Sequence, residues 1–125
     1  KMYSSTILIA EDDDTSFSLL ETILKKENFH IIRACNGSEA VDLFKQNKDV
    51  KCILMDIKMP IMNGIEATSI IKSINPEVPV IAQTAYAFNI EREKVMAAGC
   101  NDYITKPISK KLLMMLLDKY FKSAS

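Results

Sequence analysis

Short apolar segments alternate along the chain with segments in which apolar residues recur every three or four positions. The short segments are predicted strands, at Thr6–Ala10, Phe29–Ala34, Cys52–Asp56, Val78–Ala82 and Asp102–Thr105. The others predict amphipathic helices, as the spacing of Phe17, Leu20, Ile23 and Leu24 shows. Strands and helices that alternate in this way predict a parallel sheet with helices on both faces and right-handed crossovers.

Polar residues, glycine and proline mark the ends of the predicted helices. Asp13 or Asp14 is placed to cap the first helix. Asn36 and Glu39 form a capping-box variant that opens a second helix through Phe44. The remaining boundary residues are Asn47–Asp49, Asn63-Gly64, Asn75-Pro76, Gly99 after a helix over residues 86–97, and Ser109. The last helix carries an apolar stripe for core packing, made of Leu112, Leu113, Leu116, Leu117 and Tyr120.

The expected fold is α/β: a doubly wound (βα)5 domain with a five-stranded parallel sheet in the order 2-1-3-4-5, a flavodoxin-like three-layer sandwich. The 125 residues predict a single domain, 1–125, with a core from about residue 6 to residue 121. Pro79 falls at the first residues of the fourth strand, where proline is tolerated. His30 is expected to be a partly buried residue of the second strand, with no role in catalysis.

Composition narrows the class of protein. Sixteen basic and sixteen acidic residues balance, which argues against nucleic-acid binding by this domain. Three cysteines without metal-binding spacing predict reduced thiols, and no apolar run is long enough to cross a membrane. No signal-peptide pattern is present, so we expect a cytoplasmic domain without membrane contact of its own, with ends like those of a segment cut from a longer chain.

Polar side chains follow the predicted strands at their carboxyl ends. Glu11 and Asp12 follow the first strand, Asp56 ends the third, Thr84 follows the fourth and Lys106 the fifth. Because the first and third strands are neighbours where the strand order reverses, three carboxylates are expected to share one crevice. Asp56 alone is equally well explained as a turn former or helix cap.

Three carboxylates in one crevice repel each other unless some are protonated or a cation joins them. An all-oxygen pocket with open positions suits Mg²⁺. Lys106 and Thr84 would then contribute a cation and a hydroxyl to a phosphoryl group, and Asp56 would be a carboxylate nucleophile that attacks phosphorus.

Four sequence pieces, ILIAEDD, LMDIKMPIMNG, VIAQTAYA and GCNDYITKPI, occur in order, each at the end of its own predicted strand. With them the chain resembles the receiver domains of two-component response regulators, most closely those of hybrid sensor histidine kinases. The resemblance covers roughly residues 6–121. It implies that Asp56 is the phosphoacceptor of a phosphorelay in signal transduction. It also implies Mg²⁺ (or Mn²⁺) bound by Glu11, Asp12, Asp56 and the backbone carbonyl of Lys58.

The resemblance also implies how such a domain switches. Thr84 would move toward the phosphoryl group, Tyr103 would turn inward, and Lys106, with a cis bond to Pro107, would bind the phosphoryl oxygens. We predict that Lys58 and Tyr86, which flank the attack path, set the lifetime of the phosphoryl group. The domain would be phosphorylated and dephosphorylated at Asp56, with no free substrate, so its standing as an enzyme stays open.

The resemblance also indicates partners. The donor would be a phosphohistidine on a sensor histidine kinase or a histidine phosphotransfer domain. The domain would be the cytoplasmic part of a hybrid kinase, which can be membrane-bound, or a single-domain regulator. A dimer through the face of the fourth helix, fifth strand and fifth helix is one arrangement to test. Asp13, where many hybrid receivers have asparagine, is a departure that either caps the helix or alters metal affinity.

Other readings of the same residues are weaker. A pseudo-receiver, or an interaction domain that works without phosphorylation, remains open, although every chemical position is occupied by a competent residue. A phosphatase of the haloacid-dehalogenase type needs a second aspartate where Lys58 stands. A flavin-binding phosphate loop would not carry Glu11 through Asp14, and a calcium-binding EF-hand loop starting at Asp12 would lack its glycine and its terminal glutamate.

Overall fold

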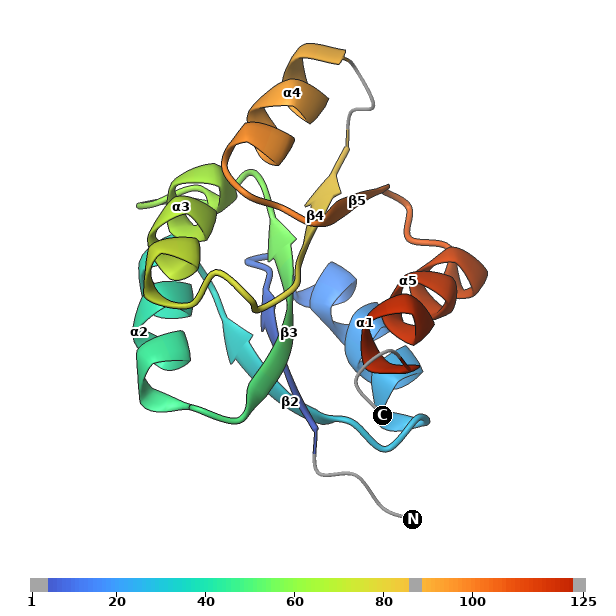
Figure 1. Cartoon of the computed structure of the whole chain (residues 1–125). Coiled ribbons are helices and arrows are strands. Elements are labelled where there is room, and N and C mark those ends of the chain that lie inside the picture. The colour runs from blue at the N-terminus through green and yellow to red at the C-terminus, as the bar shows by residue number, and fades with distance from the viewer. Residues whose placement is uncertain (1–4, 86–88, 123–125) are drawn as a thin grey trace.

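The computed structural model describes residues 5–85 and 89–122, which form one sheet with helices on both faces (Figure 1). The elements in chain order are β1 (Thr6–Ala10), α1 (Asp14–Lys25), β2 (His30–Ala34), α2 (Gly37–Gln46), β3 (Val50–Asp56), α3 (Gly64–Ile74), β4 (Val80–Thr84), α4 (Asn89–Ala97), β5 (Asp102–Thr105) and α5 (Lys110–Lys122). All four strand pairs are parallel, and the strand order is β2-β1-β3-β4-β5. The predicted fold is confirmed.

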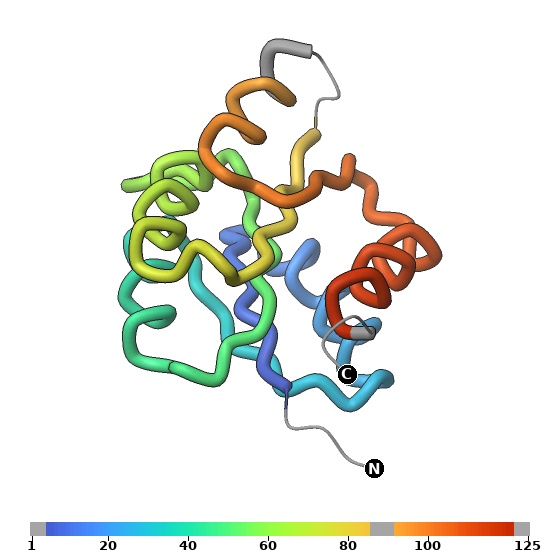
Figure 2. The backbone as a smooth tube through the Cα atoms, viewed as in Figure 1, coloured from blue at the N-terminus to red at the C-terminus, as the bar shows by residue number. Residues whose placement is uncertain are grey.

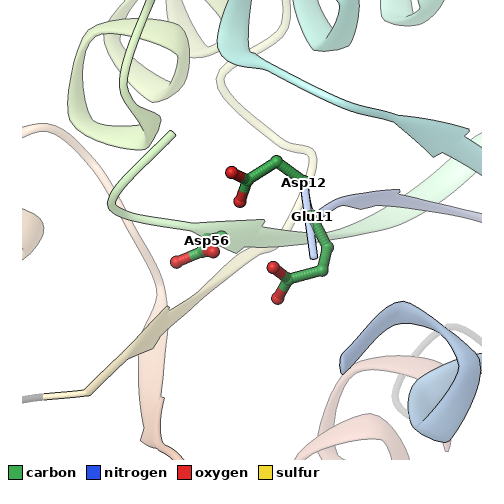
Figure 3. A group of neighbouring side chains, drawn as sticks. All are labelled: Glu11, Asp12 and Asp56. Carbon is green, nitrogen blue, oxygen red and sulfur yellow. The ribbon is translucent and has the colours of Figure 1, made fainter. Parts of the chain in front are cut away.

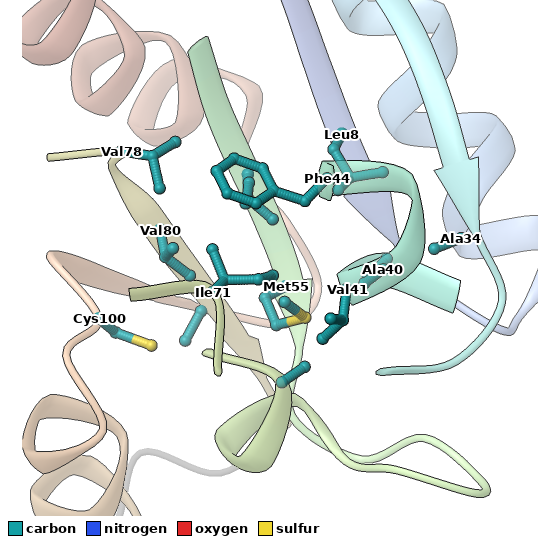
Figure 4. Close-up of a cluster of buried hydrophobic side chains, with 14 of the residues drawn as sticks. Leu8, Ala34, Ala40, Val41, Phe44, Met55, Ile71, Val78, Val80 and Cys100 are labelled. Atoms are coloured by element: carbon teal, nitrogen blue, oxygen red, sulfur yellow. The ribbon is translucent and has the colours of Figure 1, made fainter. Parts of the chain in front are cut away.

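Two apolar cores lie on the two faces of the sheet. One packs β strands against α2, α3 and α4, with Phe44 and Ile71 among its buried members (Figure 4). The other packs the opposite face against α1 and α5. Along β3, Ile53 faces the first core and Leu54 the second, and both are fully buried. A strand buried on both faces needs apolar residues at successive positions, which explains the uninterrupted apolar run before Asp56.

Side-chain caps fix where the helices begin. The Asp13 carboxylate accepts a hydrogen bond from Ser16 N at 2.8 Å, as predicted for one of the two candidate caps of α1. Asn63, predicted as a boundary residue but not as a cap, caps α3, and the Glu66 carboxylate accepts a hydrogen bond from the Asn63 backbone N–H to complete a capping box. These two caps hold the loops that follow β1 and β3 at the same edge of the sheet.

The cap of α2 is a variant of the predicted box. The Asn36 side chain accepts from Glu39 N at 2.8 Å, as expected. The Glu39 carboxylate, however, accepts from Cys35 N, one residue before the cap. The helix ends at Gln46, two residues beyond the predicted Phe44, and is followed by Asn47 as its C-cap.

The predicted position of the fourth strand was wrong by two residues. The strand runs from Val80 to Thr84 rather than from Val78 to Ala82. Pro79 lies just before it, since proline has no N–H to donate to a ladder, and its carbonyl accepts from Ile53 N at 2.9 Å. Thr84 is therefore the last residue of β4, paired with Thr105, instead of lying two residues beyond the end of the strand.

Two predicted burials were also wrong, and the second strand begins one residue later than predicted, at His30. His30 is exposed, because it starts an edge strand at the end of the sheet away from the acidic residues. Leu112 is 41% exposed, while Leu113 and Leu117 make the buried part of the α5 stripe. The three cysteines are free, as predicted; Cys52 and Cys100 are buried and Cys35 is exposed.

The topology brings the ends of distant strands together. The backbone trace shows β1 and β3 side by side at the centre of the sheet, where the chain leaves toward α1 on one face and α3 on the other (Figure 2). Ligands bind at such a reversal in open α/β sheets, so the structure places the acidic residues at a favourable point. Among the described residues, none of the helices has the length and apolar character needed to span a membrane.

Candidate functional site

Three carboxylates meet where β1 and β3 end. Glu11 follows β1 directly, Asp12 is the next residue, and Asp56 is the last residue of β3 (Figure 3). One oxygen from each lies within 4.8 Å of the others. Glu11 is fully buried, Asp56 is 6% exposed and Asp12 is exposed. The structure thus brings together the three carboxylates that the sequence predicted, with an opening to solvent at Asp12.

Lys106 supplies the positive charge of the site. Its Nζ lies 3.0 Å from Glu11 Oε1 and 3.2 Å from Asp56 Oδ2. The residue follows β5, and its backbone N–H donates to Thr84 O at 2.8 Å, which continues the pairing of β5 with β4. The Lys106–Pro107 peptide bond is cis, as the family resemblance implied. Since β4 lies between β5 and β3, the lysine side chain crosses β4 to reach the carboxylates.

Burial and charge shift the pKa values of this group. Burial raises the pKa of Glu11, and the neighbouring Asp56 charge adds to the increase, although the hydrogen bond from Lys106 opposes it. Burial alone would lower the pKa of Lys106, but its hydrogen bond to Glu11 and the attraction of Asp56 raise it overall. The lysine therefore stays charged. Its single positive charge cannot balance three neighbouring carboxylates.

The loop after β3 closes tightly around Asp56. Lys58 N lies 3.3 Å from Asp56 Oδ1, and Gly64 N donates to Ile57 O at 2.9 Å. A Cβ atom on Gly64 would lie only 2.1 Å from the backbone oxygen of Asp56, so only glycine fits here. This contact fixes the backbone that carries the Asp56 carboxylate.

A cavity of about 490 Å³ opens beside the carboxylates. It is bounded by the loop after β3 and by Lys94 of α4, and Asp12 lies at its edge. Lys58 lines it as well. The exposed carboxylate is therefore reached from a polar and apolar hollow rather than from a flat surface.

Thr84 and Tyr103 lie on the opposite face of the sheet from Lys106 and share that face with α4. Thr84 is 5% exposed, and Tyr103, paired with Ala82, is partly buried against the core beneath α2, α3 and α4. The guanidinium carbon of Arg92 lies 5.5 Å from the Tyr103 ring centroid. Tyr86, predicted to set the phosphoryl lifetime, lies outside the residues that the structure describes.

Sequence reasoning missed two residues at this site. Arg33 Nε donates to Glu11 O at 3.1 Å and so anchors the residue that begins the acidic group. Gln83, at the end of β4, is fully buried and is the strand partner of Asp56. The sequence signal for Gln83 was an amide between the apolar run Val80–Ala82 and Thr84.

The residues fit a hard divalent cation. All the candidate donors are oxygens, which is the set that Mg²⁺ prefers, and one donor stays exposed for entry. Burial, and after it the nearby charge of Asp56, raises the pKa of Glu11, and a bound cation would favour the ionised form of this carboxylate. The donor set contains neither sulfur nor imidazole among the described residues of the group, which disfavours zinc.

Comparisons with known proteins assign the family. The sequence model of the response regulator receiver domain matches residues 7–118. The chain is 39% identical to part of hybrid signal transduction histidine kinase I of Dictyostelium discoideum, over 94% of this chain but only 7% of that kinase. It is 33% identical to the polar-differentiation response regulator DivK of Brucella anthropi, over 95% of this chain and 98% of that protein. The chain belongs to the response regulator receiver domain family.

Solved structures agree. The receiver domain of a Pseudomonas aeruginosa sensor histidine kinase, determined with a magnesium ion coordinated in its active-site cleft, matches with a TM-score of 0.87 and 30% identity over 94% of this chain and 98% of that one. The receiver domain of the Saccharomyces cerevisiae response regulator Ssk1, in complex with the histidine phosphotransfer protein Ypd1, matches with a TM-score of 0.88 and 28% identity over 96% and 90%. The doubly wound fold and the receiver class are thereby shown.

Proposed function

We propose that Asp56 is the phosphoacceptor of this receiver domain and takes its phosphoryl group from a phosphohistidine. The observation that carries the proposal is the position of the Asp56 carboxylate, which is nearly buried and lies 3.2 Å from Lys106 Nζ and within 4.8 Å of two further carboxylates. A nucleophile for phosphorus needs a cationic partner for the phosphoryl oxygens, and Lys106 is placed to supply it.

In the reaction, one oxygen of Asp56 forms a bond to phosphorus while the bond from phosphorus to the donor imidazole nitrogen breaks. The nitrogen keeps the electron pair of that bond. Lys106, already beside the carboxylate, is in reach of the charge that develops on the phosphoryl oxygens. Lys58 N, at 3.3 Å from Oδ1, holds the other end of the carboxylate, so the acceptor is oriented before the donor arrives.

Glu11, Asp12 and Asp56 would hold Mg²⁺, together with the backbone carbonyl of Lys58, and Mn²⁺ suits the same oxygens. The metal, when bound, would neutralise charge on the carboxylates and on the phosphoryl oxygens. The related Pseudomonas receiver with magnesium in its cleft supports this assignment.

Thr84 and Tyr103 would form the switch. Both lie on the face that packs under α4, and the Tyr103 ring is only partly buried, which leaves room for it to turn inward when the threonine moves toward the phosphoryl group. A Thr84→Ala variant is expected to accept phosphate but to leave Tyr103 unmoved. NMR of labelled tyrosine measures this, and equal shift changes at Tyr103 in variant and parent would contradict the switch.

The partners follow from the relatives. A histidine phosphotransfer domain or a sensor histidine kinase would be the donor, as the yeast complex supports. The similarity to a segment of a much longer hybrid kinase supports a receiver domain, 1–125, that belongs to the cytoplasmic part of such a protein. The similarity over nearly the whole length of DivK supports the alternative, a single-domain regulator. A dimer through α4, β5 and α5 is a further proposal for the same surface that Tyr103 would change.

The test is the intact mass of the domain after incubation with acetyl phosphate and Mg²⁺. We expect the gain of one phosphoryl group in the parent and no gain in an Asp56→Asn variant or without the metal. If Lys58 and Tyr86 set the lifetime, replacing both changes the rate at which that added mass is lost. A parent that never gains mass, even with a panel of phosphohistidine donors, would refute the proposal and favour a domain that signals by binding alone.

A further inference from the structure

Among the residues that the structure describes, Gln83 is the buried polar side chain of the site that the proposed function does not use. Its side chain is fully buried, and neither its Oε1 nor its Nε2 has a hydrogen-bond partner among the residues that the structure describes. A buried amide without partners is unfavourable, and such groups are rare in folded proteins. Its backbone carbonyl, in contrast, accepts a hydrogen bond from Ile57 N at 3.0 Å, next to Asp56.

The sheet register shows which way the amide faces. Ile81 belongs to the core under α1 and α5, and side chains alternate along a strand, so Gln83, two residues later, faces the same side. By the same argument Asp56 follows Leu54 onto that side. Gln83 and Asp56 are paired residues on neighbouring strands, so their side chains lie next to each other on one face of the sheet.

Lys106 passes over the same part of the sheet. It follows β5, on the far side of β4 from β3, yet its Nζ reaches Asp56 on β3 and Glu11 beyond β1. Its side chain therefore crosses β4 beside Gln83. A lysine ammonium has three protons to donate, and the two carboxylates account for two of them. The Gln83 amide oxygen, which has no donor, and the Lys106 ammonium, which has a third proton to donate, thus come from adjacent strands.

We propose that Gln83 is a positioning residue for Lys106, an inference that rests on the proposed phosphoacceptor function. When a phosphoryl group on Asp56 draws the ammonium away from Glu11, the amide oxygen of Gln83 accepts a hydrogen bond from Lys106 Nζ in place of the lost carboxylate contact. The pairing satisfies the buried Oε1 of Gln83 only in the phosphorylated arrangement, so it favours that arrangement over the unphosphorylated one. The lysine is thereby held on the phosphoryl oxygens.

The kinetic test compares Gln83→Met, which keeps the volume and removes the amide, with the parent and with Thr68→Val. Thr68 is also fully buried and polar, but it lies in α3 on the opposite face. We expect Gln83→Met to take up phosphate from acetyl phosphate about tenfold more slowly. This ratio corresponds to the loss of a hydrogen bond to a charged group whose strength lies at the low end of the usual range. Thr68→Val is expected to keep the parent rate.

A double-mutant cycle separates positioning from a structural effect. In a Lys106→Met background, adding Gln83→Met is expected to cause no further loss, because the amide acts through the lysine. An equal loss in both backgrounds, or an unchanged rate in Gln83→Met, would overturn the inference while leaving the phosphoacceptor function intact. A parent that is not phosphorylated would remove the proposed function and this inference with it.

A spectroscopic measurement on the unmodified sequence keeps the inference testable should Gln83→Met fail to fold. The chain has only two glutamines, Gln83 and the exposed Gln46, so glutamine labelling gives two side-chain amide signals. With Mg²⁺ and beryllofluoride, a phosphoryl mimic, we expect the Gln83 signal to shift and the Gln46 signal to stay in place. A Gln83 signal that does not move in a domain that binds beryllofluoride would overturn the proposal.

Discussion

Replacing Glu11 by glutamine is expected to stabilise the metal-free domain at neutral pH. Burial and the charge of Asp56 raise the pKa of Glu11, so its ionised form is disfavoured in the folded state despite the hydrogen bond from Lys106. A carboxyl group whose pKa rises on folding stabilises the fold below its unfolded pKa and loses that contribution as the pH rises through its folded pKa. The parent loses this contribution as the pH rises through the raised pKa of Glu11, whereas a neutral amide of the same shape keeps it at every pH.

The magnitude follows from three opposing effects. At an effective dielectric constant of about 20, charges no more than 4.8 Å apart, as for Glu11 and Asp56, repel by at least about 3.5 kcal/mol. The attraction of Glu11 to Lys106, at 3.0 Å, is about 5.5 kcal/mol on the same scale. The variant therefore loses about 2 kcal/mol of net attraction but avoids the burial of a carboxylate, which amounts to several kcal/mol. We expect a net gain of about 1–2 kcal/mol in unfolding free energy.

The assay is urea denaturation of parent and variant, with and without Mg²⁺, at neutral and at acidic pH. The gain should disappear below the ordinary pKa range of a glutamate, where the parent carboxyl is also neutral. Mg²⁺ should stabilise the parent and have little effect on the variant, because one of its ligands is gone. A variant that is less stable than the parent at neutral pH without metal would refute the reasoning, since it would show that the Lys106 ion pair outweighs burial.

Two further predictions concern the backbone around the site and its far end. Gly64→Ala is expected to lose about 1–3 kcal/mol of stability and to slow phosphorylation, because the added methyl group would displace the Asp56 backbone. Chemical denaturation measures the stability and intact-mass kinetics measure the rate. An unaltered phosphorylation rate would contradict the importance of this contact. Lys72→Met should lose about 1–3 kcal/mol of stability, because Lys72 Nζ donates to Val78 O at 2.6 Å and to Asn101 Oδ1 at 2.7 Å. It should keep the parent phosphorylation rate, since these contacts lie at the end of the sheet away from the site. A slower phosphorylation rate would contradict that separation.

Local signals in the sequence were reliable where one segment alone decides the structure. The apolar run before Asp56 predicted a central buried strand, and Asp13 was one of two acids expected to cap α1. The apolar run around Pro79 misled the assignment of β4, because its residues fit a strand in either position, and only pairing with β3 and β5 fixed the strand at Val80–Thr84. Leu112 fitted a helical stripe as well as Leu113 did, but packing against the sheet selected only one of them.

The sequence by itself determined the class of this protein. Alternating periodicities specify parallel strands with helices, and the residues at the ends of four of the five strands include carboxylates, a threonine and a lysine in a recognisable order. The tertiary structure alone decided how these groups meet. Lys106 and Glu11 are 95 residues apart in the chain and 3.0 Å apart in space, and Gln83 lies beside Asp56 because β4 pairs with β3 in one register. Periodicity acts over a few residues, whereas strand order and register arise from the packing of the whole sheet, which no single segment encodes.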